Sequence, residues 1–141
     1  MKSFEEYISE GIVRKITPDT QRAENLYLES ERKLKQLKKT INRQGIDDEN
    51  ANDYVEYCYN IMMFLIRANM LEKGYTSSGQ GAHEAEVSFA GILGLSEEEI
   101  RFLDELRYFR NGILYYGKRF DKDYALKIIE FVKQTIEKLR K

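Results

Sequence analysis

The segment RYFRNGILYYGKRF, residues 107–120, concentrates side chains that could bind an anion, with four basic and five aromatic residues. Arg110 is unusual within it, because at about 100° per residue a helix places this arginine in the middle of an apolar stripe. The stripe consists of Leu103, Leu106, Ile113 and Leu114. A charge on an apolar face costs several kcal/mol unless it is paired and hydrogen-bonded. The sequence therefore predicts a partner for Arg110: a carboxylate from another helix, a group of a facing subunit, or a ligand phosphate, which a guanidinium binds bidentately.

The neighbours of Arg110 suit a nucleotide cleft or a protein interface. Tyr108, Asn111 and Tyr115 share one helix face through their spacing of three and four residues. Tyr115 lies about 140° around the helix from Arg110, so the two can line one pocket only if the backbone departs from the helix or a dimer supplies two copies. Gly112 would permit such a departure. We expect ligand contacts from Arg107, Tyr108, Arg110, Tyr116 and Lys118.

His83 is the only histidine, and it follows the glycine- and serine-containing segment GYTSSGQG. An imidazole that titrates near neutral pH is a natural general acid or base, but His83 would need a partner from elsewhere in the fold. Backbone amides before a helix also form a generic anion site. The segment lacks the Lys-Ser/Thr of a P-loop, so a flexible connector is its simpler interpretation, and a surface or capping role is the simpler one for His83.

Metal chemistry has little support in the composition. Cys58 is the only cysteine, which excludes an intrachain disulfide and a thiolate cluster and favours a packed core thiol. A lone histidine cannot complete a metal site. We therefore expect no metal and no cofactor.

The pattern of the chain predicts an all-α fold, with one proline, nine glycines and apolar residues at helical spacing. Ser3 with Glu6 begins a first helix of about four turns that reaches Ile16. Thr17 and Pro18 begin a long charged helix that stops before Gly45. The remaining helices are expected at 50–73, at 82–93, from Ser96 and from Asp121. We expect an up-and-down bundle of four long helices plus one or two short ones, with the helix at 50–73 in its centre.

Length and charge limit what this bundle can be. A chain of 141 residues without a composition shift predicts one domain. Its net charge of −1 lacks the basic excess of a protein held mainly by phosphate, so any nucleic-acid contact must be local. The longest apolar run, 61–66, is too short for a span of about 20 residues, and the N-terminus lacks an apolar signal region. We expect a soluble, cytoplasmic protein without a membrane partner.

The helical pattern and the dipeptide Arg110-Asn111 together resemble the HEPN superfamily (higher eukaryotes and prokaryotes nucleotide-binding). The resemblance covers most of the chain: a long second helix, an apolar third, a connector followed by GAHEAEVSFAGIL, and then LDELRYFRNGILYYG. The family motif is Arg-polar-x-x-x-His, and Arg110 and Asn111 match its first two positions. Tyr115 stands where the family has histidine.

The resemblance implies that residues 1–141 form a single HEPN-like domain and a homodimer in which two copies of the motif meet. It also implies, for many members, metal-independent endoribonuclease activity and a toxin–antitoxin pair with a small nucleotidyltransferase; other members are not catalytic. The candidate catalytic positions are Arg110, Asn111 and Tyr115, with His83 as a further candidate base.

The tyrosine affects which activity we expect. Cleavage of RNA by its own 2′-OH needs a proton acceptor that titrates near neutrality and a positive charge for the phosphorane. Arg110 supplies charge, whereas tyrosine, with a pKa of about 10, is a poor base at pH 7. We therefore favour a homodimeric module that binds a nucleotide, RNA or a nucleotidyltransferase through the Arg110 region with weak or no nuclease activity. The alternatives are a ribonuclease toxin that uses His83 or a tyrosine, and a purely structural bundle.

Overall fold

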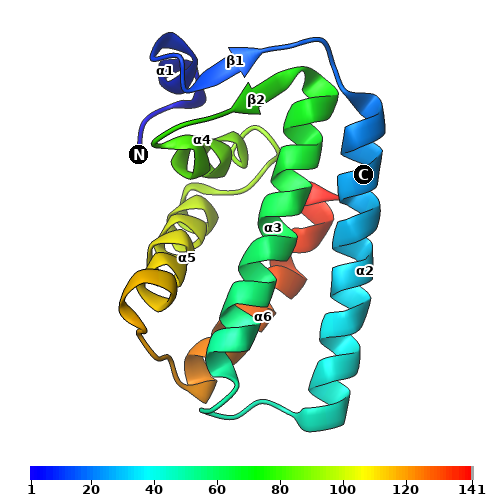
Figure 1. The fold of residues 1–141 in the computed structure, drawn as a ribbon, viewed down its shortest axis with the longest axis vertical. Helices are drawn as coiled ribbons and strands as arrows, with labels where there is room; N and C mark the ends of the chain where they lie inside the picture. The colour runs from blue at the N-terminus through cyan, green and yellow to red at the C-terminus, as the bar shows by residue number, and fades with distance from the viewer. Residues whose placement is uncertain (141) are drawn as a thin grey trace.

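The computed structural model describes residues 1–140 and is mostly helical, which confirms the predicted helical class (Figure 1). The elements are α1 Phe4–Ser9, β1 Val13–Lys15, α2 Thr20–Gln44, α3 Ala51–Lys73, β2 Tyr75–Ser77, α4 Ala82–Phe89, α5 Glu97–Tyr116 and α6 Lys122–Leu139. Among these residues, none of the helices combines the length and apolar character that crossing a membrane requires.

Local capping signals explain where several helices begin. The Ser3 and Ser96 hydroxyls accept from the amides three residues later, and both form capping boxes, as predicted. Asp121 caps α6 by accepting from the Tyr124 amide at 2.9 Å. The predicted start at Thr17 is wrong, because Asp19 caps α2 by accepting from the Arg22 amide at 3.1 Å.

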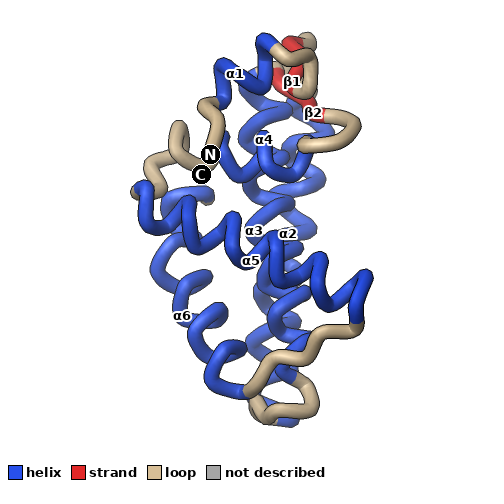
Figure 2. The backbone as a smooth tube through the Cα atoms, turned by 90° about the vertical axis from the view of Figure 1, so that its left-hand side faces the viewer, coloured by secondary structure: helices blue, strands red, loops and turns tan. Residues whose placement is uncertain are grey.

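The predicted first helix is too long. Helix α1 ends at Ser9, and Gly11 adopts φ 76°, a left-handed conformation that suits glycine and ends helical propagation. The chain then forms β1, which pairs antiparallel with β2 in the register Val13↔Ser77, Arg14↔Thr76 and Lys15↔Tyr75. Figure 2 shows this two-stranded ribbon at the same end of the molecule as α1 and α4. Part of the expected flexible connector is therefore a strand held by the N-terminal segment.

Helix α3 forms the centre of the core, as its nearly continuous apolar surface predicts. It is buried from Ala51 to Leu71 on most of its circumference and contacts α2, α4, α5 and α6 (Figure 1). The buried Asn69 amide donates to the Leu139 carbonyl at 2.9 Å, which fastens the end of α6 to α3. Cys58 is buried in this core, where burial raises the pKa of its thiol to about 12.

The fully buried residues of helix α5 lie in its first half. Leu103 and Leu106 are fully buried, whereas Ile113 is half-buried and Leu114 is 48% exposed. The apolar stripe predicted around Arg110 is therefore covered at one end and open at the other. Arg110 is half-buried and lies where α5 leaves the core.

Candidate functional site

A cleft of about 390 Å³ lies between the beginning of α4 and the second half of α5. Residues 79–84 form one wall, and Arg107, Arg110, Asn111 and Tyr115 form the other. His83 therefore shares a cleft with Arg110, Asn111 and Tyr115, the residues beside which it was considered as a candidate base. The cleft is one that a phosphate-bearing ligand could enter, since ligand sites commonly have volumes of about 300–1,000 Å³.

Arg110 lies against an aromatic ring. Its guanidinium carbon is 5.3 Å from the ring centroid of Tyr59, which is buried on α3. Its Nε atom is buried without a hydrogen-bond partner, and among residues 1–140 no carboxylate forms an ion pair with it. A cation–π contact of this kind contributes about 0.5–2 kcal/mol and leaves the positive charge in place. Arg110 thus keeps a charge that no carboxylate of the described chain neutralises.

Arg107, one turn earlier, is in a different state. Its Nε donates to Asp104 Oδ1 at 2.9 Å, and its Nη2 lies 3.8 Å from Glu84 Oε1. Glu84 also accepts a hydrogen bond from the hydroxyl of Tyr7 at 3.5 Å. The cleft therefore contains two arginines and one carboxylate, and Arg110 is the arginine whose charge is available.

His83 faces the same cleft from the first turn of α4, and its side chain is exposed. Its Nδ1 lies 3.5 Å from the hydroxyl of Tyr59. Partial loss of surrounding water lowers the pKa of the imidazole, the Glu86 carboxylate opposes this change, and Arg67, Arg110 and Arg107 add to it. The imidazole is therefore neutral at pH 7 and can accept a proton. Burial raises the pKa of Tyr59 to about 12, so its hydroxyl stays protonated.

The other predicted ligand contacts lie outside the cleft. Tyr115 lines it while remaining 74% exposed, but Tyr108 and Tyr116 are exposed and do not line it. The Lys118 ammonium instead lies 5.1 Å from the ring centroid of Phe109 and 5.5 Å from that of Phe120. These three residues were expected to contact a ligand and are not part of this cleft.

Arg110 and Tyr115 need neither a departure from the helix nor a dimer to line one cleft, contrary to the prediction. Both line the cleft although α5 remains helical through Gly112 to Tyr116. The angle of 140° applies to the directions in which the side chains leave the helix. A long arginine side chain and an exposed tyrosine can reach the same broad cleft from positions that do not share a face.

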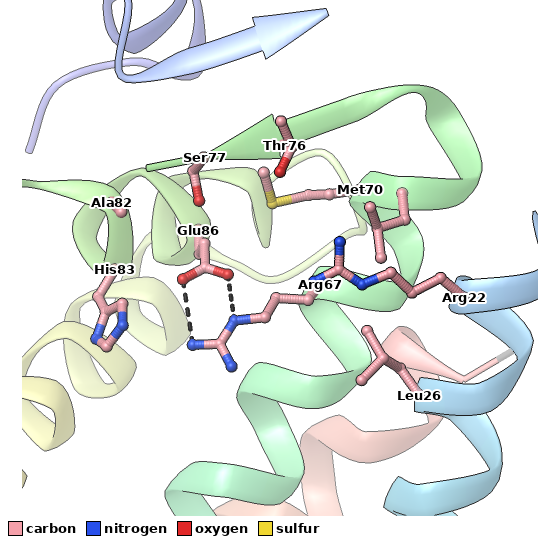
Figure 3. A pocket seen from close by; sticks show the side chains of 10 residues that line it. Arg22, Leu26, Arg67, Met70, Thr76, Ser77, Ala82, His83 and Glu86 are labelled. Carbon is pink, nitrogen blue, oxygen red and sulfur yellow. Dashed lines mark hydrogen bonds and ion pairs between the residues drawn. The ribbon is translucent and has the colours of Figure 1, made fainter. Parts of the chain in front are cut away.

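A second cavity, of about 400 Å³, adjoins the first at the beginning of α4. Ala82 and His83 line both cavities. The second is also lined by Arg22 from α2, Arg67 from α3, Thr76 and Ser77 from β2, and Glu86 from α4 (Figure 3). The guanidinium of Arg67 donates to Glu86 from two nitrogens, at 2.5 and 3.3 Å. Glu86 is almost fully buried, with a side chain 4% exposed.

Sequence reasoning missed Tyr59, Arg67 and Glu86. Tyr59 lies in the apolar run of the central helix, a position typical of a core residue. Arg67 carried a signal, because it is the one charge between Tyr57 and Leu71 in the central helix. Its partner could not be found from spacing, since Glu86 is on another helix.

Metal-binding clusters and related proteins are two further indicators of function. Within residues 1–140, no group of three or more His, Cys, Asp and Glu side chains could hold a metal ion. Comparison with protein-family models, curated proteins and solved structures finds no match to this chain. The geometry of the cleft is therefore the basis on which a function can be proposed.

Proposed function

We propose that the cleft between α4 and α5 binds a phosphate group of a nucleotide or RNA, in a HEPN-like domain whose four long helices form an up-and-down bundle. The observation that carries this proposal is Arg110, whose charge has no carboxylate partner among residues 1–140 and whose Nε is buried and unsatisfied. Asn111 and His83 add hydrogen-bonding groups on opposite walls. A guanidinium in these surroundings favours an anionic oxygen acceptor such as a phosphate.

Fluorescence anisotropy with labelled RNA and displacement by uridine monophosphate test this proposal. Arg110→Ala should weaken binding at least about tenfold, since a hydrogen bond to a charged group contributes about 1.5–3 kcal/mol. Arg43→Ala removes the same charge from the exposed far end of α2 and should leave binding nearly unchanged. Equal binding by the wild type and Arg110→Ala would show that Arg110 is structural and that the bundle has another role.

Metal-independent cleavage of RNA is a second candidate function, favoured by the position of His83 beside Arg110. A neutral His83 imidazole would accept the proton of a 2′-OH as its oxygen attacks the adjacent phosphorus. The bond to the 5′-oxygen would then break, with a proton from solvent or Tyr115, and leave a cyclic phosphate. Arg110 would stabilise the charge of the phosphorane.

RNA degradation in the presence of EDTA measures this activity directly. Cleavage that His83→Gln and Arg110→Ala each abolish, while Arg43→Ala retains it, would establish the nuclease. RNA that stays intact with wild-type protein, while binding persists, would leave the non-cleaving module as the function.

We also propose, from the resemblance, a homodimer and a small nucleotidyltransferase as partner. Exposed apolar side chains on α5 support an interface there: Tyr108, Leu114 and Tyr116 are 67%, 48% and 87% exposed. Analytical ultracentrifugation of the wild type and of Tyr116→Ser tests the dimer. A monomer at all concentrations would remove this part of the proposal.

A further inference from the structure

The two cavities that meet at His83 have matching features. Each has a volume of about 400 Å³ or slightly less, and Ala82 and His83 line both. Each contains two arginines and one carboxylate among its charged lining residues, which gives each a formal charge of +1 with histidine neutral. The polar surface therefore continues past His83 from α5 to α2.

The second cavity has its own arginine without a carboxylate partner. Arg67 is neutralised by Glu86, whereas Arg22 forms no ion pair among residues 1–140. Figure 3 shows Arg22 extending from α2 toward the cavity that also contains Arg67 and Glu86. The hydroxyl-bearing residues Thr76 and Ser77 line the same cavity. The exposed Arg22 therefore reaches this cavity from α2, as the half-buried Arg110 reaches the first cavity from α5.

The two cavities lie at different positions along α3. Arg110, in the first cavity, lies over Tyr59, and Arg67, which lines the second cavity, is eight residues after Tyr59 on α3. At 1.5 Å per residue, this separation corresponds to about 12 Å along α3. One phosphate group cannot contact both ends of such a surface, whereas successive phosphates of a polynucleotide can.

We infer that the two cavities form one track for a single-stranded oligonucleotide, with Arg110 contacting one phosphate, Arg22 contacting another, and His83 between them. This inference rests on the proposed function, because it extends the ligand of the Arg110 cleft. The exposed rings of Tyr115 and His83 offer faces on which unpaired bases stack. A duplex would have its bases covered and could not use these faces.

The test compares a short and a long ligand in the same set of variants. The probes are uridine monophosphate and an oligouridylate of about eight nucleotides, a length within the usual range for single-strand sites. Arg22→Ala should weaken binding of the oligouridylate about threefold to tenfold and leave binding of the monophosphate unchanged. A plot of the logarithm of the binding constant against the logarithm of the salt concentration should also become less steep. The slope should change by about one, the amount that corresponds to one lost phosphate contact. Arg110→Ala should weaken binding of both probes.

Control variants and outcomes separate this inference from the function on which it depends. Arg43→Ala removes a charge from the same helix as Arg22 and should match the wild type with both probes. If Arg110→Ala weakens binding and Arg22→Ala does not affect the oligouridylate, the track is wrong while the phosphate cleft stands. If Arg110→Ala has no effect on either probe, the proposed function fails first.

The same assay with oligodeoxythymidylate and with duplex RNA defines the ligand further. Equal binding of the deoxy strand supports the track, because its contacts are to phosphate and base faces. Duplex RNA that binds more tightly than the single strand would overturn the inference.

Discussion

Arg67 on the central helix α3 and Arg110 on α5 are both partly buried, but only one of them has a carboxylate partner. Arg67 forms a two-point ion pair with Glu86, whose side chain is 4% exposed. Arg110 has only the ring of Tyr59 beside it, and its Nε is buried without a partner. The first arrangement is complete within the chain, while the second leaves hydrogen-bonding capacity for something else. An arginine near a core is therefore a candidate ligand contact only when no carboxylate of the chain pairs with it.

The largest effect should come from breaking the completed pair. Arg67→Ala leaves the buried Glu86 carboxylate uncompensated, and removal of one partner of a buried pair costs about 3–5 kcal/mol. Because the Arg67 side chain is one-third exposed, we expect a loss at the lower end of this range, about 3 kcal/mol in the free energy of unfolding. Urea denaturation measures this loss. The double variant Arg67→Met/Glu86→Leu should recover much of the loss, and an Arg67→Ala protein as stable as the wild type would show that the pair is not structural.

Removal of Arg110 should affect stability much less. Arg110→Ala loses a cation–π contact of about 1 kcal/mol and also removes a buried, unsatisfied Nε. We expect the free energy of unfolding to change by less than about 1 kcal/mol, as measured by the same urea titration. Arg110→Met, which keeps the apolar stem, is the matched control. A loss as large as that of Arg67→Ala would contradict the contrast between the two arginines.

The smallest effect concerns His83, which borders both arginines. Its pKa is lowered from 6.5 in the folded protein, so below this pH the unfolded chain binds more protons than the folded one. Its contribution to stability is therefore present above about pH 6.5 and is lost as the pH falls. Because the ring is exposed, we expect this contribution to the free energy of unfolding to be only a few tenths of a kcal/mol.

Urea titrations of the wild type and His83→Gln at about pH 7.5 and about pH 5.5 measure this effect, since carboxylates shared by both proteins cancel in the comparison. The wild type should lose more stability than His83→Gln. An equal or smaller loss would show that His83 titrates normally in the folded protein.

Local signals in the sequence predicted where several helices begin or end. The capping boxes at Ser3 and Ser96 and the stop at Gly74 depend on residues within one turn, so their pattern is visible in the chain. Central placement of α3 followed from its apolar circumference. The strand β1 could not be predicted in this way, because three residues become a strand only through pairing with β2 more than fifty residues later.

The site was predictable only in part for the same reason. Helical periodicity singled out Arg110, and the single histidine singled out His83. That the two share a cleft depends on how α4 packs beside α5, which no local pattern encodes. Tyr59 and Glu86 decide which arginine is neutralised, and both contacts join different helices.

The pairing of β1 with β2 has a consequence for the order in which the site is completed during folding. Residues 79–84, one wall of the cleft, follow β2 directly, and the Ser78 amide donates to the Ile12 carbonyl at 3.1 Å. Contacts between residues so distant in the chain are slow to form, because a long loop must close first. A nascent chain can therefore form α2 and α3 early, but it acquires this wall only after its first residues return to meet the segment that follows α3.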